Sequence, residues 1–250
     1  MIFLLDIGNS RIKWAQLRGT VLEFGESLVN TGLADDTVFE EWRSLEQPLR
    51  VVGSCVAENA VATAVVHWIR QAWGIETQWL GVSRQQGGVV NGYDDPGQLG
   101  IDRWMAVVAA RQLTSRAAIV IDCGTAINIE ALSSKGHYMG GAIMPGMTMS
   151  LSSLGGKTAK IGDIRLGNAL AFGTSTAESV SIGVLQSTLA GIEAICDRFQ
   201  RRLGTDVEYF ITGGDARWIK DYLNIPVRYE KALVLRGVAA VCMEFEEISG

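Results

Sequence analysis

Histidine and closely spaced cysteines are scarce in this sequence of 250 residues. It contains two histidines and four cysteines, and no two cysteines have the C-x-x-C spacing. A histidine-rich metal site or a histidine-based catalytic triad is therefore disfavoured. The cysteines fit a reduced, cytosolic protein with buried thiols better than disulfides or structural zinc.

Excess positive charge and long apolar runs are also lacking. The net charge is −5, so no overall field attracts nucleic acid, and we expect a small-molecule partner in a local basic pocket. No apolar run approaches the about 20 residues that cross a bilayer. The apolar stretch before Asp6 is too short for a signal peptide. We therefore expect a cytoplasmic protein with neither a membrane nor a nucleic-acid partner.

A short apolar run at residues 2–5 leads into Asp6-Ile7-Gly8-Asn9-Ser10 and then Arg11-Ile12-Lys13. This pattern predicts a buried strand that ends in a sharp turn. Gly8 has no Cβ to keep a ligand off the backbone, and Asp6 could order a hydrated cation. The turn suits a polyphosphate, although a plain β-hairpin with a polar turn is the alternative for this segment alone.

A second copy of the pattern lies at residues 119–126, where Asp122-Cys123-Gly124-Thr125 follows another apolar run. The two aspartates are 116 residues apart, close to half the chain. This spacing predicts two related α/β domains, 1–115 and 116–250, which present their turns to a shared cleft. Each turn should join adjacent strands of a hairpin, unlike the strand-turn-helix of a dinucleotide site.

Two further glycine-rich segments bear on nucleotide binding. Gly213-Gly214-Asp215 follows a predicted strand and would let the backbone lie against adenosine. Residues 154–158 resemble the end of a P-loop, but that motif requires glycine where this chain has Leu151. No strand pattern precedes this segment and no helix pattern follows it, so we reject the P-loop interpretation.

Gly100-Ile101-Asp102-Arg103 lies where a glycine-rich loop at 85–100, which contains Tyr93, meets a predicted helix that ends near residue 113. In kinase chemistry, Asp102 could accept a proton from a substrate hydroxyl. Arg103 could bind a substrate carboxylate with bidentate geometry. The alternative is a first-turn aspartate that complements the helix dipole beside a surface arginine.

Apolar periodicity predicts the remaining helices. They are expected at 35–45, at 61–73 after an N-cap at Asn59, over a long amphipathic stretch at 174–202, and through 234–242. Residues 150–173 show no clear pattern, and residues 21–28 are expected to form one strand.

The sequence resembles the type III pantothenate kinases of the acetate kinase/sugar kinase/Hsp70/actin-like superfamily. The resemblance extends over nearly the whole chain, and its Leu-Gly-x-Asp-Arg element is specific to that family. It is carried by residues 6–13, 96–103, 122–126, 140–146, 174–178 and 212–215. It implies two duplicated RNase H-like (actin-like ATPase) domains, each a mixed five-stranded sheet with flanking helices, and an ATP cleft between them.

The resemblance also implies ATP-dependent phosphorylation of pantothenate to 4'-phosphopantothenate, the first step of coenzyme A biosynthesis. It implies Mg²⁺ with ATP, K⁺ or NH₄⁺ bound at Asp122, and a homodimer. Asp102 would be the catalytic proton acceptor. ATP would be bound by Asp6, Ile7, Gly8, Asn9, Ser10, Arg11, Ile12, Lys13 and Thr125. Pantothenate would be bound by Tyr93, Gly100, Ile101, Asp102, Arg103 and Thr176, although Thr176 could also be an ordinary threonine at a helix start.

Two other functions remain open at this stage. Proteins with this pattern are also named as accessory factors for transcription, which would make the chain a binding protein. A kinase or phosphohydrolase of the same superfamily that acts on another small molecule is the second possibility.

Overall fold

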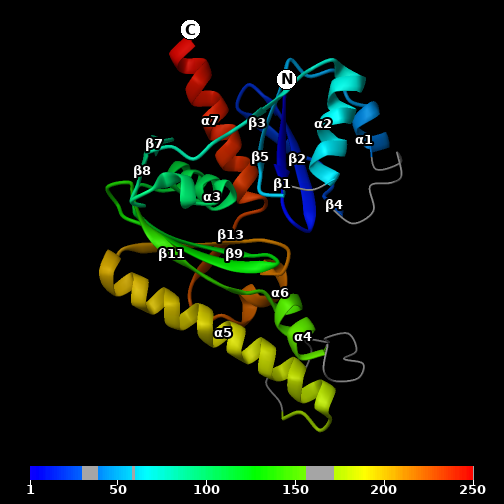
Figure 1. Cartoon of the computed structure of the whole chain (residues 1–250). Helices are drawn as coiled ribbons and strands as arrows, with labels where there is room; N and C mark the ends of the chain where they lie inside the picture. Colours follow the sequence, from blue (N-terminus) through cyan, green and yellow to red (C-terminus); the bar gives the residue numbers. More distant parts are fainter. Residues whose placement is uncertain (30–38, 58–59, 156–171, 250) are drawn as a thin grey trace. The chain divides into compact units, whose positions relative to one another are not determined.

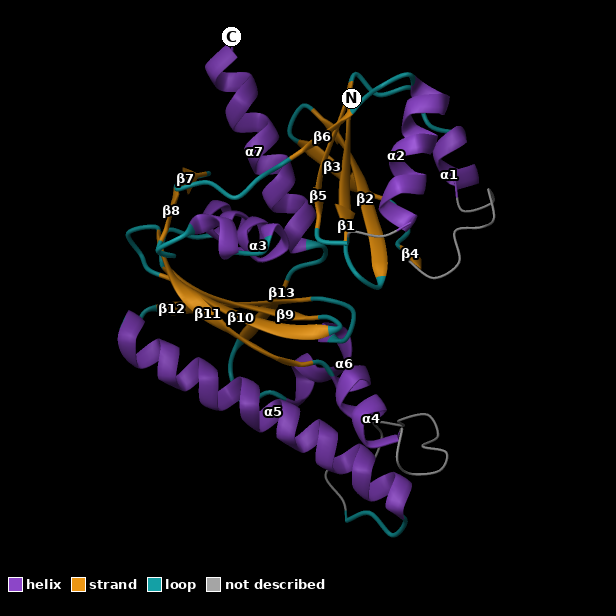
Figure 2. Ribbon diagram, viewed as in Figure 1, coloured by secondary structure: helices purple, strands orange, loops and turns teal. Residues whose placement is uncertain are grey.

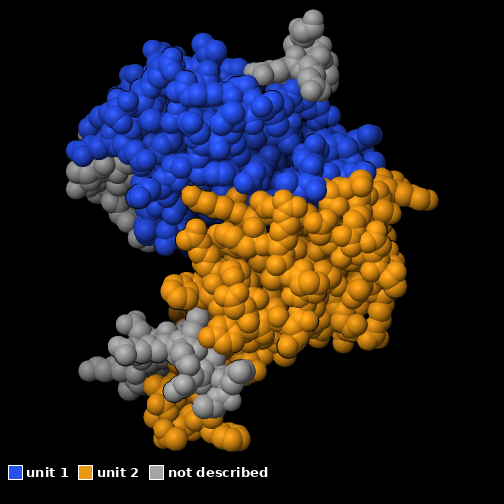
Figure 3. All heavy atoms as spheres, turned by 180° about the vertical axis from the view of Figure 1, so that it is seen from behind, with its two compact units in different colours: residues 1–113, 232–250 blue, residues 114–231 orange. Residues whose placement is uncertain are grey.

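The computed structural model describes residues 1–29, 39–57, 60–155 and 172–249. Its contacts divide the chain into two compact units (Figure 3), Met1–Leu113 with Ala232–Gly250 as unit 1 and Thr114–Lys231 as unit 2. The division predicted from sequence falls at residue 115 and assigns the last segment to the C-terminal half. Packing instead groups residues 232–250 with unit 1.

Unit 1 is built on a mixed sheet with the order β3-β2-β1-β5-β6, and β4 also pairs with β2. The pairs β1–β2 and β2–β3 are antiparallel, whereas β1–β5 and β5–β6 are parallel. The strands are β1 Ile2–Ile7, β2 Arg11–Arg18, β3 Val21–Phe24, β4 Leu28–Val29, β5 Arg50–Cys55 and β6 Thr77–Trp79. The single strand predicted at 21–28 is thus two short strands.

Helices lie on both faces of this sheet (Figures 1 and 2). Helices α1 (Glu40–Arg43) and α2 (Ala60–Trp73) cover the face that carries Phe3 and Trp14, with which they form a buried aromatic core. The other face packs against α7 (Leu233–Ser249), which in turn packs on α3 (Ile101–Leu113). Because side chains alternate along a strand, Asp6 points away from the aromatic core.

The close packing of α3 on α7 depends on Gly237. A Cβ at Gly237 would lie 2.0 Å from the main-chain oxygen of Met105, so a side chain there would push the two helices apart. The connection into α3 contains the antiparallel pair β7 (Gln85–Gln86) and β8 (Val89–Asn91), and then η2 (Pro96–Gln98). The loop predicted at 85–100 therefore contains regular structure.

Unit 2 repeats the strand order of unit 1, because β11-β10-β9-β12-β13 corresponds to β3-β2-β1-β5-β6. Strand β10 is antiparallel to both β9 and β11, and β12 is parallel to both β9 and β13. The strands are β9 Ala117–Cys123, β10 Ala126–Leu132, β11 His137–Pro145, β12 Val207–Thr212 and β13 Val227–Tyr229. The predicted α/β class with mixed sheets is confirmed.

The long helix α5 (Thr176–Leu203) packs on this sheet and confirms the helix predicted at 174–202. Among the described helices it is the one that meets a test of length and apolar composition for a membrane span, with a mean hydropathy of 1.4. Buried core helices meet the same test. Val184, Leu189 and Ile192 of α5 are buried in one cluster with strand residues of β9 and β10, so one face of α5 packs into the core of unit 2.

The described residues of unit 2 also form three short helices: α4 (Met147–Gly155), α6 (Ala216–Ile219) and η4 (Lys220–Tyr222). Helix α4 begins before, and extends into, the stretch at 150–173 for which the sequence shows no pattern. Residues 156–158 of the P-loop-like match, the N-cap proposed at Asn59 and the first four residues of the helix predicted at 35–45 fall outside the described residues. The described part of that helix contains α1, which ends two residues before the predicted end.

Candidate active site

The two Asp-x-Gly segments are both hairpin turns, as predicted. The amide of Gly8 donates to the Arg11 oxygen at 3.0 Å, and the amide of Gly124 donates to the Ala126 oxygen at 3.1 Å. Each turn joins antiparallel neighbours, β1 with β2 and β9 with β10. The side chains of Ile7 and Ile12 are fully buried, so these two residues can offer a ligand their main chain only.

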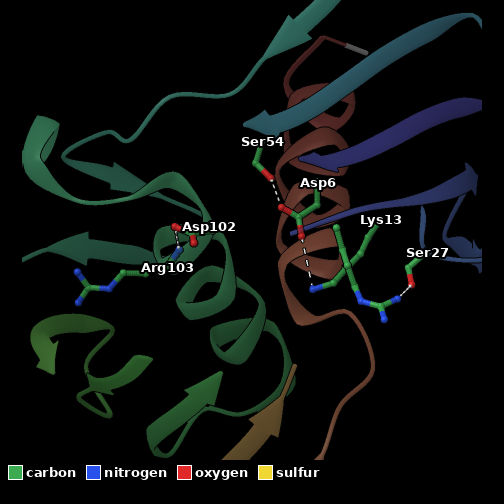
Figure 4. A network of polar contacts seen from close by, with 7 residues as sticks. Asp6, Lys13, Ser27, Ser54, Asp102 and Arg103 are labelled. Atoms are coloured by element: carbon green, nitrogen blue, oxygen red, sulfur yellow. Dashed lines mark hydrogen bonds and ion pairs between the residues drawn. The ribbon is translucent and has the colours of Figure 1, made fainter. Parts of the chain in front are cut away.

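Asp6 is a buried carboxylate with few partners. It is 5% exposed, its Oδ1 accepts a 3.2 Å hydrogen bond from the Ser54 hydroxyl, and its Oδ2 lies 3.8 Å from the Lys13 ammonium (Figure 4). Burial raises the pKa of Asp6, Lys13 opposes that rise, and the charge of Asp102 adds to it. Asp6 and Asp102 are therefore close enough to repel each other.

Ser54 is the residue of this network that the sequence did not reveal. It lies on β5 in parallel register with Asp6 of β1 and is fully buried. A serine in an apolar strand has no local signal of function, because its contact with Asp6 spans 48 residues of chain. Arg11, also in the predicted ATP turn, is exposed and donates a 2.9 Å hydrogen bond to the Ser27 hydroxyl.

Asp102 lies in the first turn of α3. Its Oδ1 accepts a 2.8 Å hydrogen bond from the amide of Arg103, and no hydrogen-bond partner of Oδ2 is found within the described residues. A Cβ at Gly100 would lie 2.6 Å from Asp102 Oδ1. Glycine at position 100 therefore leaves room for the carboxylate in this orientation.

Arg103 and Tyr93 form a pair. Arg103 Nη1 donates to the Tyr93 hydroxyl at 3.1 Å. Arg84 fixes the loop that carries Tyr93, because its guanidinium donates to the main-chain oxygens of Tyr93 at 2.7 Å and Asp94 at 3.1 Å. The buried Asn91 side chain accepts a 2.9 Å hydrogen bond from the Tyr93 amide. A cationic group and a phenol are thus held in place near Asp102.

Three turns meet in unit 2. A Cβ at Gly213, where φ is +101°, would lie 2.3 Å from the Cys123 oxygen and 2.6 Å from Asp122 Oδ1. The Asp215 amide also donates to the Cys123 oxygen at 3.1 Å. From the other side, a Cβ at Gly146 would lie 2.4 Å from the Gly124 oxygen. These approaches require glycine and leave Thr125 exposed at the surface of the turn.

Thr176 is the exposed first residue of α5. The helix start is already capped, because Ser175 Oγ accepts from the Glu178 amide at 3.2 Å and Glu178 Oε2 accepts from the Thr174 amide at 2.8 Å. Thr176 also lines a groove of about 1070 Å³ between α4 and the start of α5. Its side chain is therefore not needed for the cap and faces open space.

The predicted site residues thus fall into two sets. Unit 1 contains Asp6 to Lys13, Tyr93 and Gly100 to Arg103, whereas unit 2 contains Asp122, Thr125 and Thr176. Within the described residues, no group of three or more His, Cys, Asp or Glu side chains could by itself hold a metal ion. A cation at Asp122 would need oxygen atoms from the main chain, water or a ligand as well.

Comparison with known proteins assigns the chain to one family. The sequence model of type III pantothenate kinase matches residues 2–198. A protein of that name from Nitrosospira multiformis is 34% identical over 99% of this chain and 93% of its own length. Another, from Nitrosococcus oceani, is 32% identical over 99% of this chain and 96% of its own length.

Solved structures show the same fold at lower identity. A candidate Baf family transcriptional activator from Campylobacter jejuni has a TM-score of 0.62 at 19% identity, covering 98% of this chain and 99% of its own. A candidate 2-dehydro-3-deoxygalactonokinase from Sinorhizobium meliloti has a TM-score of 0.57 at 13% identity, with the same coverage of both chains. The chain thus has the fold of these two solved structures, and it belongs to the type III pantothenate kinase family.

Proposed function

We propose that this kinase transfers the γ-phosphoryl group of ATP to the hydroxyl of pantothenate, which yields 4'-phosphopantothenate for coenzyme A biosynthesis. One observation carries the proposal beyond family membership. Asp6 on β1 and Asp102 on α3 belong to one compact unit, in which α3 packs on β5, the parallel neighbour of β1. In agreement with this arrangement, burial raises the pKa of Asp6, Lys13 opposes the rise, and the charge of Asp102 adds to it. Asp6, which belongs to the phosphate-binding turn, and Asp102, which faces the acceptor hydroxyl in this proposal, therefore lie close enough in unit 1 to interact electrostatically.

Asp102 acts as the proton acceptor. Its Oδ1 is held by the Arg103 amide at 2.8 Å, which leaves Oδ2 to take the proton of the attacking hydroxyl. Phosphoryl transfer demands little covalent work of the protein, so the main task of Asp102 is to hold and deprotonate the acceptor. The first-turn position that suggested a simple helix-dipole role is compatible with this function, because only one oxygen is engaged.

Arg103 and Tyr93 hold pantothenate in this proposal. Pantothenate ends in a carboxylate, which a guanidinium binds with two parallel hydrogen bonds. The 3.1 Å bond from Arg103 to the Tyr93 hydroxyl orients that guanidinium before substrate arrives. Gly100 and Ile101 contribute main chain, and the exposed Thr176 hydroxyl binds a substrate hydroxyl.

The turn from Asp6 to Lys13, together with Thr125, holds ATP. Asp6 suits a hydrated Mg²⁺ because its carboxylate oxygens keep unused lone pairs. The carboxylate accepts one hydrogen bond and has one ammonium at 3.8 Å. When bound, Mg²⁺ neutralises charge on the phosphates. Asp122, beside main-chain oxygens of its own turn, is the oxygen ligand proposed for K⁺ or NH₄⁺.

The active form in this proposal is a cytoplasmic homodimer of a duplicated two-domain chain. The identical strand order of the two units supports the duplication. The groove between α4 and α5, where Met149 and Leu154 are 45% and 47% exposed, supports the dimer, because a partner could cover it. The free cysteines, three of them buried, support a reducing compartment.

Light scattering tests the dimer. The double variant Met149→Asp, Leu154→Asp should have the mass of a monomer, because two charged side chains in the groove would oppose the binding of a partner subunit. Leu49→Asp, at an 80% exposed leucine of unit 1, is the matched control and should remain a dimer. A wild-type monomer, or a double variant that remains dimeric, would contradict this part of the proposal.

A coupled assay of ADP release tests the activity. We expect release that depends on pantothenate, that requires Mg²⁺, and that is higher in K⁺ or NH₄⁺ than in Na⁺. A panel of other small acids and sugars should give no release above the background without acceptor. Equal release with and without pantothenate would point to a hydrolase, and no nucleotide turnover at all would point to an accessory protein.

A further inference from the structure

The hydroxyl of Ser54 forms a hydrogen bond with the Asp6 carboxylate. It donates to Asp6 Oδ1 at 3.2 Å, and within the described residues Asp6 is the acceptor found for it. Ser54 is 0% exposed and lies opposite Asp6 across the parallel pair β1–β5. A polar side chain in a buried strand is costly unless it is paired, so this contact explains why the strand can carry it.

The hydrogen bond gives the two oxygens of Asp6 different tasks. Oδ1 accepts the hydrogen bond from Ser54, and Oδ2 forms a long ion pair with Lys13 at 3.8 Å (Figure 4). The last torsion of an aspartate is a broad, roughly two-fold rotor and does not fix the carboxylate by itself. Without Ser54, the carboxylate could turn and close on the lysine ammonium.

We propose that Ser54 is a positioning residue of the nucleotide site: it holds the Asp6 carboxylate turned so that Oδ2 stays available to the magnesium nucleotide. The inference rests on the proposed function, in which Asp6 belongs to the ATP turn. It adds a residue of β5 to a site otherwise made, in unit 1, by the β1–β2 turn and the start of α3. Ser54 does not touch the reacting atoms and acts through Asp6.

The first test is calorimetric binding of Mn²⁺-ADP, which needs no turnover. Ser54→Ala should bind this complex about tenfold more weakly than the wild type, because it loses a hydrogen bond to a charged group. Ser54→Cys, of similar size and with a weak donor, should fall between the two. In steady-state assays, Ser54→Ala should raise the Mg²⁺ concentration for half-maximal rate and leave the KM for pantothenate unchanged.

Val52→Ala is the matched control for a purely structural effect. Val52 lies two residues earlier on β5 and is 1% exposed, so this variant removes buried volume from the same strand without touching the carboxylate. It should lower the Tm and leave the affinity for Mn²⁺-ADP unchanged. If Val52→Ala weakens binding as much as Ser54→Ala, the positioning role is overturned.

A double-mutant cycle tests whether Ser54 acts through Asp6. In the Asp6→Asn background, Ser54→Ala should cause little further loss of Mn²⁺-ADP affinity, since the carboxylate that it orients is gone. Fully additive losses, or a Ser54→Ala protein with wild-type affinity, would overturn the inference. Failure of the proposed function is a separate result: the wild type would then release no pantothenate-dependent ADP, whatever its affinity for Mn²⁺-ADP.

Discussion

Arg103 Nη1 and the Tyr93 hydroxyl are joined by a 3.1 Å hydrogen bond that connects the start of α3 to the loop before it. The Arg103 guanidinium also lies 6.0 Å from the centre of the Tyr93 ring. A long, flexible side chain is thus ordered before substrate binds, so less conformational entropy is lost on binding.

Tyr93→Phe should therefore weaken substrate binding more than it slows the chemical step. We expect the KM for pantothenate to rise about tenfold, as for one lost hydrogen bond to a charged group, with kcat and the KM for ATP little changed. Tyr229→Phe removes a similar contact in unit 2, a 3.1 Å bond from Arg217, and should leave the KM for pantothenate unaltered. Equal effects of the two variants would contradict the pantothenate site.

Asp102→Asn should fold, remain dimeric and lose nearly all turnover. Removal of a general base costs about 10²–10⁴-fold in rate, and an amide cannot take the hydroxyl proton. Circular dichroism and light scattering check the fold and the dimer, and ADP release measures the rate. Asp94→Asn, at an exposed carboxylate in the preceding loop, is the control and should keep wild-type activity. Full activity of Asp102→Asn would rule out the assignment of the base.

Asp6→Asn should raise the Tm of the metal-free protein at neutral pH while it abolishes activity. Burial raises the folded-state pKa of Asp6 above 3.8, so the ionised carboxylate destabilises the native state. Below about pH 3.8, the carboxyl is protonated in both states and the advantage of the variant disappears. The Tm difference between variant and wild type should therefore grow as the pH rises from 4 toward neutrality. A wild type more stable than the variant at pH 7 would contradict this.

Gly237→Ala should destabilise unit 1 and lower activity together. The new Cβ would lie 2.0 Å from the Met105 main-chain oxygen, so α7 and α3 must separate. Overpacking of this kind costs about 1–3 kcal/mol. Because α3 carries Asp102, the displaced helix should also lower kcat. Gly81→Ala, where nothing lies within 4 Å of the new Cβ, is the control and should unfold at or above the wild-type denaturant concentration.

Thiol labelling of the native protein should modify Cys55 alone at pH 8. Burial, followed by the charge of Glu193, raises the pKa of Cys196 to about 12, and burial raises that of Cys123 well above its ordinary value. Cys55 is half-buried, whereas Cys242 is buried like the other two. Mass spectrometry after brief exposure to iodoacetamide identifies the labelled residues. Rapid modification of Cys123 or Cys196 would show that their burial is wrong.

The features that the sequence revealed are local ones. The turns at Asp6 and Asp122 could be predicted because an apolar run, an acid and a glycine lie within a few residues. The helix at 176–203 could be predicted from the spacing of its apolar residues. Asp102 could be singled out because it stands beside Arg103 at the junction of a loop and a helix.

The features that the sequence did not reveal depend on distant partners. Ser54 reaches Asp6 across parallel strands, and a parallel register leaves no trace in the nearby sequence. Helix α4 is rich in serine and methionine, with no strong apolar face to identify it. Residues 232–250 belong to unit 1 because α7 packs on α3 and on the sheet strands β1, β2 and β5, and the apolar pattern of the closing helix does not identify these partners.

That closing helix has a consequence for synthesis on the ribosome. Unit 2 is one uninterrupted segment, so every contact it needs is available while residues beyond 231 are still being translated. Unit 1 must wait for α7, and until α7 emerges the face of β1 that bears Asp6 lacks its cover. The half of the chain that is made first is therefore the half that matures last, and a nascent chain stopped before residue 232 should present that apolar face to chaperones.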